Sequence, residues 1–334
     1  MKDFHKWIKK QRKNHKKLLV QIKHDAPHIV IPVFLCIVLV ALTHLDLEVK
    51  KDIEKVRLRN DVPFSSEPLY PVLQKQFVPK ISAHAALILD NDSQVIIFER
   101  NPSIRFSMAS TTKIMTALVA LSYYQDTDVI TVYSSNAEGV NVGFAPFEKL
   151  YFKDMLYGLL LPSGNDAAYA IADNYPDGRD VFVTKMNQKA QELGLQDTHF
   201  ADPAGLIDDQ NFTTAHDLAR LTSVAIQNPV FRHVTSTKKK TIHDITERRT
   251  YNVTNLNRLL GQNGVTGVKT GFTEGAGEVL VTTKLENGKT FVIVVMKSED
   301  RFADTQALLS LITENVTYID PLYTMLRNEQ RQKR

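Results

Sequence analysis

Ser110 and Lys113 are separated by three positions, a spacing that places two side chains on one face of a helix. Residues 111–124 carry apolar side chains at helical spacing, which predicts a helix that begins at Ser110. A serine hydroxyl becomes a nucleophile when a base takes its proton, and burial can lower the pKa of a lysine enough for that task. The pair therefore predicts a nucleophile, Ser110, and a general base, Lys113. The pattern is not rare, because residues 236–239 repeat it in a polar, basic setting.

A second polar group, Ser163-Gly164-Asn165, lies between the predicted helices 150–161 and 166–172. Ser163 could relay a proton with Lys113, and the amide of Asn165 could hold a substrate carbonyl. These residue types also form ordinary turns. The group indicates a catalytic role only because it follows Ser110 and Lys113 in the sequence.

Lys269-Thr270-Gly271 is a rarer tripeptide and occurs once, on a predicted strand. Lys269 offers a positive charge, and Thr270 a hydroxyl, to a substrate carboxylate. Gly271 would let a substrate backbone approach the strand closely. We expect the backbone amide of Phe272 to face Ser110 as an oxyanion donor.

The predicted elements run as strands, then many helices, then strands. The first strands cover 85–89 and 95–98, and the last cover 279–284 and 290–297, joined by a turn at Glu286-Asn287-Gly288. This order indicates an α+β fold, an α/β sandwich whose antiparallel sheet is flanked by helices and interrupted by a mostly helical insertion. A closing helix is expected over 304–316.

The first 45 residues indicate a membrane anchor. Lysines and one arginine crowd residues 1–28, and residues 29–45 are apolar except for Thr43 and His44. A basic flank before an apolar span predicts a transmembrane helix with its N-terminus in the cytoplasm. A cleaved signal peptide is the alternative. Residues 46–80, rich in charge and then in proline, are expected to be a stalk, 81–318 a catalytic domain outside the membrane, and 319–334 a polar tail.

Composition narrows the chemistry of the outer domain. Cys36, the single cysteine, lies in the apolar span, which excludes disulfides and thiolate sites after it. No histidine pair has metal-ligand spacing, so neither a metal nor a cofactor is expected. The net charge of +4 is modest and the basic run precedes an apolar span, so we expect no nucleic-acid partner.

The ordered motifs resemble those of the serine-type D-alanyl-D-alanine carboxypeptidases, which are low-molecular-mass penicillin-binding proteins with a β-lactamase/transpeptidase-like fold. The resemblance extends from about residue 83 to 316 and is close over 186–206, 214–218 and 269–277. Arg301 matches an arginine that the family places near the substrate carboxylate. Phe272 stands where some relatives have histidine, which bears on specificity.

The resemblance implies a reaction and its partners. Ser110 would attack the carbonyl between the two terminal D-alanines of a peptidoglycan stem peptide, D-alanine would leave, and water would hydrolyse the acyl-enzyme. β-Lactam antibiotics would acylate the same serine. Endopeptidase activity stays open, as do two alternatives: a class A-like β-lactamase, and a non-enzymatic penicillin or cell-wall sensor. A class A enzyme needs a glutamate to activate water, and only Glu192 and Glu247 lie between Asn165 and Lys269.

Overall fold

The computed structural model describes residues 70–133 and 137–319, together with residues 6, 10, 12–14 and 16 of the basic segment. The chain divides into two units, 1–67 and 68–334. The described residues of the first unit are helical and exposed. The span predicted at 29–45 lies outside the described residues, and no helix within them combines the length and apolarity needed to cross a membrane.

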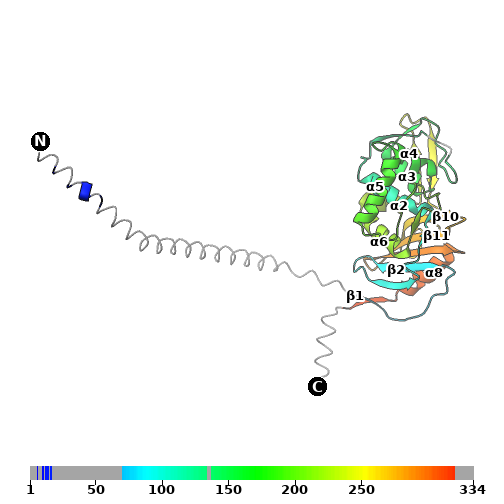
Figure 1. Cartoon of the computed structure of the whole chain (residues 1–334). Coiled ribbons are helices and arrows are strands. Elements are labelled where there is room, and N and C mark those ends of the chain that lie inside the picture. The colour runs from blue at the N-terminus through cyan, green and yellow to red at the C-terminus, as the bar shows by residue number, and fades with distance from the viewer. Residues whose placement is uncertain are drawn as a thin grey trace, which may run out of the picture. The chain divides into compact units, whose positions relative to one another are not determined.

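A five-stranded antiparallel sheet is the centre of the second unit (Figure 1). Its strands stand in the order β10-β11-β12-β2-β3, so strands from both ends of the chain share one sheet, as predicted. The strands are β2 (Ala85–Asp90), β3 (Ile96–Arg100), β10 (Val265–Thr273), β11 (Gly277–Glu286) and β12 (Lys289–Ser298). Asn287 and Gly288 form the predicted tight turn, and both have positive φ (52° and 75°), as such hairpins require.

The apolar runs of these strands are explained by burial on both faces of the sheet. Side chains alternate along a strand, and on β12 Val292 and Val294 join one hydrophobic cluster while Ile293 and Val295 join another. The first cluster also contains the helices of the insertion, and the second contains α8 (Arg301–Ile312). The sheet is therefore a middle layer between two sets of helices.

The helical insertion gathers on one side of the sheet (Figure 1). Its buried centre is α2 (Lys113–Leu121), which is apolar on nearly every side and packs against its helical neighbours. The insertion's helices are η1 (Ala109–Thr112, a 3₁₀ turn), α3 (Phe152–Leu160), α4 (Asn165–Asp173), α5 (Arg179–Glu192), α6 (Ala215–Ala225) and α7 (Pro229–Thr235). Its short strands are β4 (Phe106–Ser107), β5 (Val129–Thr131), β6 (Lys149–Tyr151), β7 (Phe212–Thr213), β8 (Lys239–His243) and β9 (Thr250–Thr254).

Two boundaries differ from the prediction. Strand β1 (Tyr70–Leu73) lies within the range expected to be a stalk, 46–80, and pairs with β13 (Val316–Ile319). The side chain of Asn315 extends this pairing, since it accepts from the Lys75 amide and donates to the Lys75 carbonyl, both at 2.8 Å. The prolines that suggested a linker did not reveal this long-range partner. The closing helix, in turn, starts three residues earlier than expected, at Arg301.

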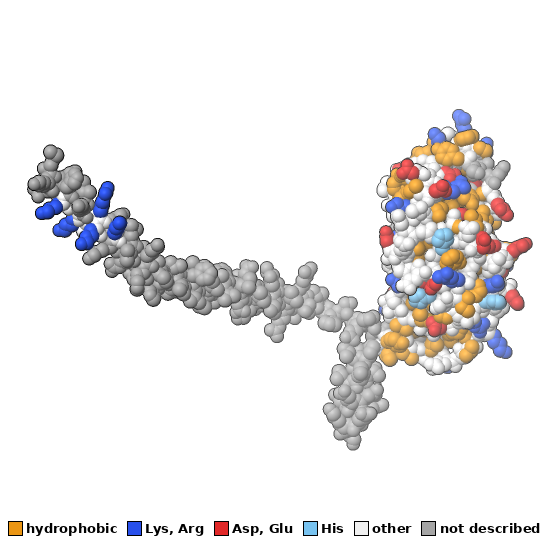
Figure 2. All heavy atoms as spheres, viewed as in Figure 1, with side chains coloured by type: hydrophobic (Ala, Val, Ile, Leu, Met, Phe, Trp, Pro, Cys, Tyr) orange, Lys and Arg blue, Asp and Glu red, His pale blue; other side chains and the backbone are white. Residues whose placement is uncertain are grey.

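Basic and acidic side chains are interspersed over the face of the second unit that Figure 2 shows, with apolar side chains between them. Neither sign of charge dominates this view. On this face, no patch of a single charge marks a binding surface.

Candidate active site

Ser110 lies on η1, directly before α2, so the predicted nucleophile and the predicted base lie on one continuous helical segment. Ser110 is partly exposed, whereas Lys113 is fully buried. Ala109, which precedes the serine, adopts a left-handed backbone with φ 46°. Such a conformation is unfavourable for alanine and occurs mainly where the surrounding structure imposes it.

The Nζ atom of Lys113 contacts three oxygen atoms. It lies 3.0 Å from Oγ of Ser110, 2.7 Å from Oδ1 of Asn165 and 2.7 Å from the carbonyl oxygen of Ala204. An ammonium group can donate to all three. Once deprotonated, the amine keeps two N–H donors for Asn165 and Ala204, and its lone pair is left to face the Ser110 hydroxyl. The arrangement therefore suits proton removal from Ser110.

Burial adjusts this lysine for the task. Desolvation lowers the pKa of Lys113 to about 7, against the opposing effect of the negative charges of Asp202 and Asp166. A base with a pKa near the ambient pH is present in its neutral form and still accepts a proton readily.

Asn165 is the first residue of α4, and its position brings the second motif to Lys113. Its Nδ2 donates to the carbonyl oxygen of Glu138 at 2.5 Å, so this amide is already bonded within the protein. Ser163 has φ 71°, and its buried Oγ has no hydrogen-bond partner among the described residues. The predicted relay from Ser163 to Lys113 is thus not formed here, although the hydroxyl is free to make it.

Strand β10 runs beside η1, and a glycine allows the approach. A Cβ atom at Gly271 would lie 3.1 Å from the Met108 carbonyl oxygen and 3.2 Å from the Ser110 amide nitrogen. Phe272 follows with a side chain that is 61% exposed. The third motif is thereby placed next to the nucleophile, where the Phe272 amide was expected.

Three residues bring positive charge and a hydroxyl to this edge of the sheet. Lys269 and Thr270 are buried, and Arg301 donates from Nη1 to the Gly271 carbonyl at 2.7 Å. Burial, with the positive charges of Lys113 and Arg301, lowers the pKa of Lys269 well below its usual value. A substrate carboxylate would relieve this crowding of positive charge.

The segment 202–208 completes the site, and no role was predicted for it. Gly205 has φ 82°, and a Cβ there would lie 2.0 Å from the Ala109 carbonyl oxygen. Asp208 accepts from the Thr273 hydroxyl at 2.5 Å and from the Gly275 amide, so it ties this segment to the end of β10. The Asp-Pro-Ala-Gly sequence at 202–205 carries a turn signal, which was the available hint.

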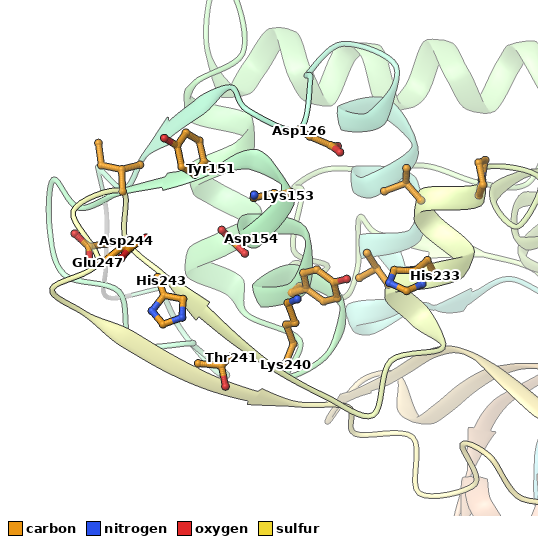
Figure 3. A pocket seen from close by; sticks show the side chains of 15 residues that line it. Asp126, Tyr151, Lys153, Asp154, His233, Lys240, Thr241, His243, Asp244 and Glu247 are labelled. Carbon is orange, nitrogen blue, oxygen red and sulfur yellow. The ribbon is translucent and has the colours of Figure 1, made fainter.

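The glutamates considered for a class A enzyme lie elsewhere. Glu192 bonds Lys189 on the exposed surface of α5, at 2.9 Å. Glu247 lines a cavity of about 750 Å³ between α3, α7 and the β8–β9 hairpin (Figure 3). The charged side chains around this cavity include Lys153, Asp154 and Lys240, and none of the predicted site residues lines it.

Comparison with known proteins agrees with the fold. The crystal structure of the Streptomyces K15 DD-transpeptidase superimposes with a TM-score of 0.67 at 32% identity, covering 71% of this chain and 98% of that one. A D-alanyl-D-alanine carboxypeptidase from the same Streptomyces strain is 35% identical over 240 residues, 66% of this chain and 82% of the relative. A D-alanyl-D-alanine endopeptidase of Pseudomonas aeruginosa is 32% identical over 265 residues, 75% of this chain and 85% of that protein.

The fold and the site together define a penicillin-binding, transpeptidase-like serine peptidase. The family model described as D-alanyl-D-alanine carboxypeptidase matches residues 73–300. The chain belongs to this family, peptidase family S11. It spans 57% of the length of one relative, the D-alanyl-D-alanine carboxypeptidase DacF of Bacillus subtilis, with 30% identity over 222 residues.

Proposed function

We propose that this protein removes the terminal D-alanine from peptidoglycan stem peptides through an acyl-enzyme on Ser110, and that β-lactam antibiotics acylate the same residue. The observation that carries the proposal is the contact of a buried Lys113, with its pKa lowered to about 7, with the Ser110 hydroxyl at 3.0 Å. The family match and the relatives named for this activity support the choice of substrate.

In the first step, neutral Lys113 takes the Ser110 proton while Oγ attacks the carbonyl carbon of the D-Ala-D-Ala bond. The negative charge that develops on the carbonyl oxygen would be stabilised by the backbone amides of Ser110 and Phe272. Lys269, Thr270 and Arg301 would hold the terminal carboxylate. These contacts select a substrate that ends in a free carboxylate.

In the second half of the reaction D-alanine leaves and the acyl-enzyme is hydrolysed, which regenerates the free enzyme. Lys113, now an ammonium, supplies a proton to the leaving D-alanine nitrogen, and the free hydroxyl of Ser163 offers the path between them. Water then attacks the ester carbonyl as it gives a proton to neutral Lys113. The bond between the acyl carbon and Oγ breaks, and Lys113 returns that proton to Ser110. No metal or cofactor takes part in this scheme.

The test uses residues 68–319 and a peptide that ends in D-Ala-D-Ala. Release of D-alanine, measured with a coupled D-amino acid oxidase assay, should be lost in Ser110→Ala. Ser236→Ala is the matched control, because Ser236 begins the second S-x-x-K sequence but lies at the end of α7, and it should keep full activity. Covalent penicillin capture without D-alanine release would instead favour a sensor, and rapid penicillin hydrolysis a β-lactamase.

Endopeptidase activity is the second candidate, since the P. aeruginosa relative with 32% identity is named for it. Cross-linked muropeptide dimers and monomeric pentapeptides should be compared at equal concentration. Faster cleavage of the dimer cross-link than of the pentapeptide would assign the endopeptidase role.

We also propose that residues 29–45 anchor the protein in the cell membrane, with the catalytic unit outside. The basic flank and the apolar span support this orientation. The full chain should resist carbonate extraction from membranes. Added protease should digest the catalytic unit in spheroplasts but not in sealed inside-out membrane vesicles, where the unit would lie in the lumen. Soluble, N-terminally trimmed protein would favour a cleaved signal peptide.

A further inference from the structure

Asp202 is a buried carboxylate, 4% exposed, that neither the motifs nor the proposed reaction uses. It accepts hydrogen bonds from the four successive backbone amides of residues 204–207, at 2.6 to 3.0 Å. The Nδ2 of Asn211 donates to the same carboxylate at 2.5 Å. These hydrogen bonds fix the carboxylate of Asp202 in place and hold the turn around it.

That turn is attached to the helix of the general base. The carbonyl oxygen of Pro203 accepts from the Thr116 hydroxyl at 2.6 Å, and the carbonyl oxygen of Ala204 accepts from Lys113 Nζ at 2.7 Å. Asp202 therefore determines the position of the Ala204 carbonyl oxygen, which is one of the two acceptors for the N–H groups of neutral Lys113. A displaced Ala204 carbonyl would leave the lone pair of Lys113 free to turn away from Ser110.

We propose that Asp202 is a positioning residue for acylation: its carboxylate holds the Ala204 carbonyl against Lys113 and places a negative charge beside the general base. The proposal rests on the proposed function in one respect, because its test measures acylation of Ser110. It assigns Asp202 two separable effects, one on geometry and one on charge.

The charged groups that face Lys113 are few. Asp202 comes from the turn, Asp166 from α4, and Lys269 from β10, while η1 contributes the neutral Ser110. Asp202 is the larger of the two acidic influences that oppose desolvation at Lys113. Without its charge the ammonium form is less stable, so Lys113 would deprotonate at lower pH.

The experiment measures the rate constant of labelling by a fluorescent penicillin as a function of pH. In the unaltered protein the rate should rise with a midpoint near 7, as Lys113 loses its proton. In Asp202→Asn we expect the plateau to fall about tenfold to a hundredfold. The midpoint should move about one pH unit lower, as expected when a nearby opposite charge is removed.

Asn211→Ala is the matched control, because it disturbs the same turn but leaves the Asp202 charge in place. It should lower the plateau without moving the midpoint. An equal midpoint shift in this variant would overturn the role of the charge. An unmoved midpoint in Asp202→Asn would do the same, and an unchanged plateau would overturn the role in geometry.

Asp202→Asn turns an N–H group toward backbone donors and can lower the yield of folded protein. The labelling rate constant reports only on folded molecules, and Asp202→Ser, in which water can fill the vacated space, is a second neutral variant that should show the same midpoint shift. If the unaltered protein is not labelled at all, the proposed function fails. If it is labelled and both neutral variants keep its midpoint and its plateau, the inference about Asp202 is wrong while the proposed function stands.

Discussion

At the scale of single residues, two buried lysines of lowered pKa have opposite requirements. In the proposed reaction Lys113 must be neutral to take a proton, whereas Lys269 must be charged to hold a carboxylate. Desolvation acts on both, and the charge of Lys113 lowers the pKa of Lys269 further. The proposed reaction therefore requires the protonation state in which Lys113 is neutral and Lys269 is still charged.

We predict a bell-shaped pH profile of kcat/KM for D-alanine release. The acid limb should have its midpoint near 7, where Lys113 becomes neutral, and the alkaline limb should lie below 10.5, where Lys269 loses its charge. In Lys269→Arg the alkaline limb should move to higher pH, because a guanidinium stays charged, while the acid limb stays in place. Identical alkaline limbs in both proteins would show that Lys269 is not the group that titrates.

Ser163 offers a test that separates catalysis from folding. Its buried Oγ has no hydrogen-bond partner in the part of the chain that the structure describes, so Ser163→Ala should leave the melting temperature unchanged or slightly higher. If the hydroxyl relays the proton to the leaving amine, kcat/KM should fall about a hundredfold. Full activity in the variant would rule out the relay.

At the scale of elements, the site depends on a close approach between a strand and a helical turn. Gly271 on β10 and Gly205 in the 202–208 turn both face η1. A Cβ at Gly205 would overlap the Ala109 carbonyl oxygen, and one at Gly271 would be tight against η1, with contacts of 3.1 to 3.2 Å. The contact sets the distance between Ser110, the proposed nucleophile, and β10, the strand proposed to hold the substrate. Glycines in these places are thus explained by contact across the fold.

Gly271→Ala should lower the penicillin labelling rate by about tenfold or more, because the new Cβ would press on the Met108 carbonyl and the Ser110 amide. Gly288→Ala is the control: its φ is 75° but nothing lies within 4 Å of the added Cβ. It should lose about 1 kcal/mol of stability and keep its labelling rate. Equal rates in the two variants would contradict the proposed role of the β10–η1 contact.

At the scale of the molecule, the compact unit includes a strand from the range expected to be a stalk. Pro71 of β1 is buried, Val72 and Leu73 are half-buried, and β13 pairs with them. The two strands form their own small sheet, apart from β10 and η1. Stability and catalysis should therefore respond differently to removal of β1.

A chain that starts at residue 81 should be less stable than one that starts at residue 68, by about 2 kcal/mol for the lost apolar burial. This corresponds to a melting temperature about 4–8 °C lower in thermal unfolding. Both chains should release D-alanine at the same kcat/KM at 25 °C, well below the transition. A matching melting temperature would mean that β1 adds nothing to the unit.

The order of the motifs could be read from the sequence, and the shared sheet and the helix that follows Ser110 could be predicted from it. These predictions follow from local periodicity and from residue types that carry reactive or charged groups, such as Ser110, Lys113 and Lys269. Only the tertiary structure decided that a backbone carbonyl, that of Ala204, contacts Lys113 across 91 positions of the chain. Every residue has a backbone carbonyl, so no residue type in the sequence marks this one. The role proposed for Asp202 depends on the same contact, because its carboxylate holds the turn that carries the Ala204 carbonyl.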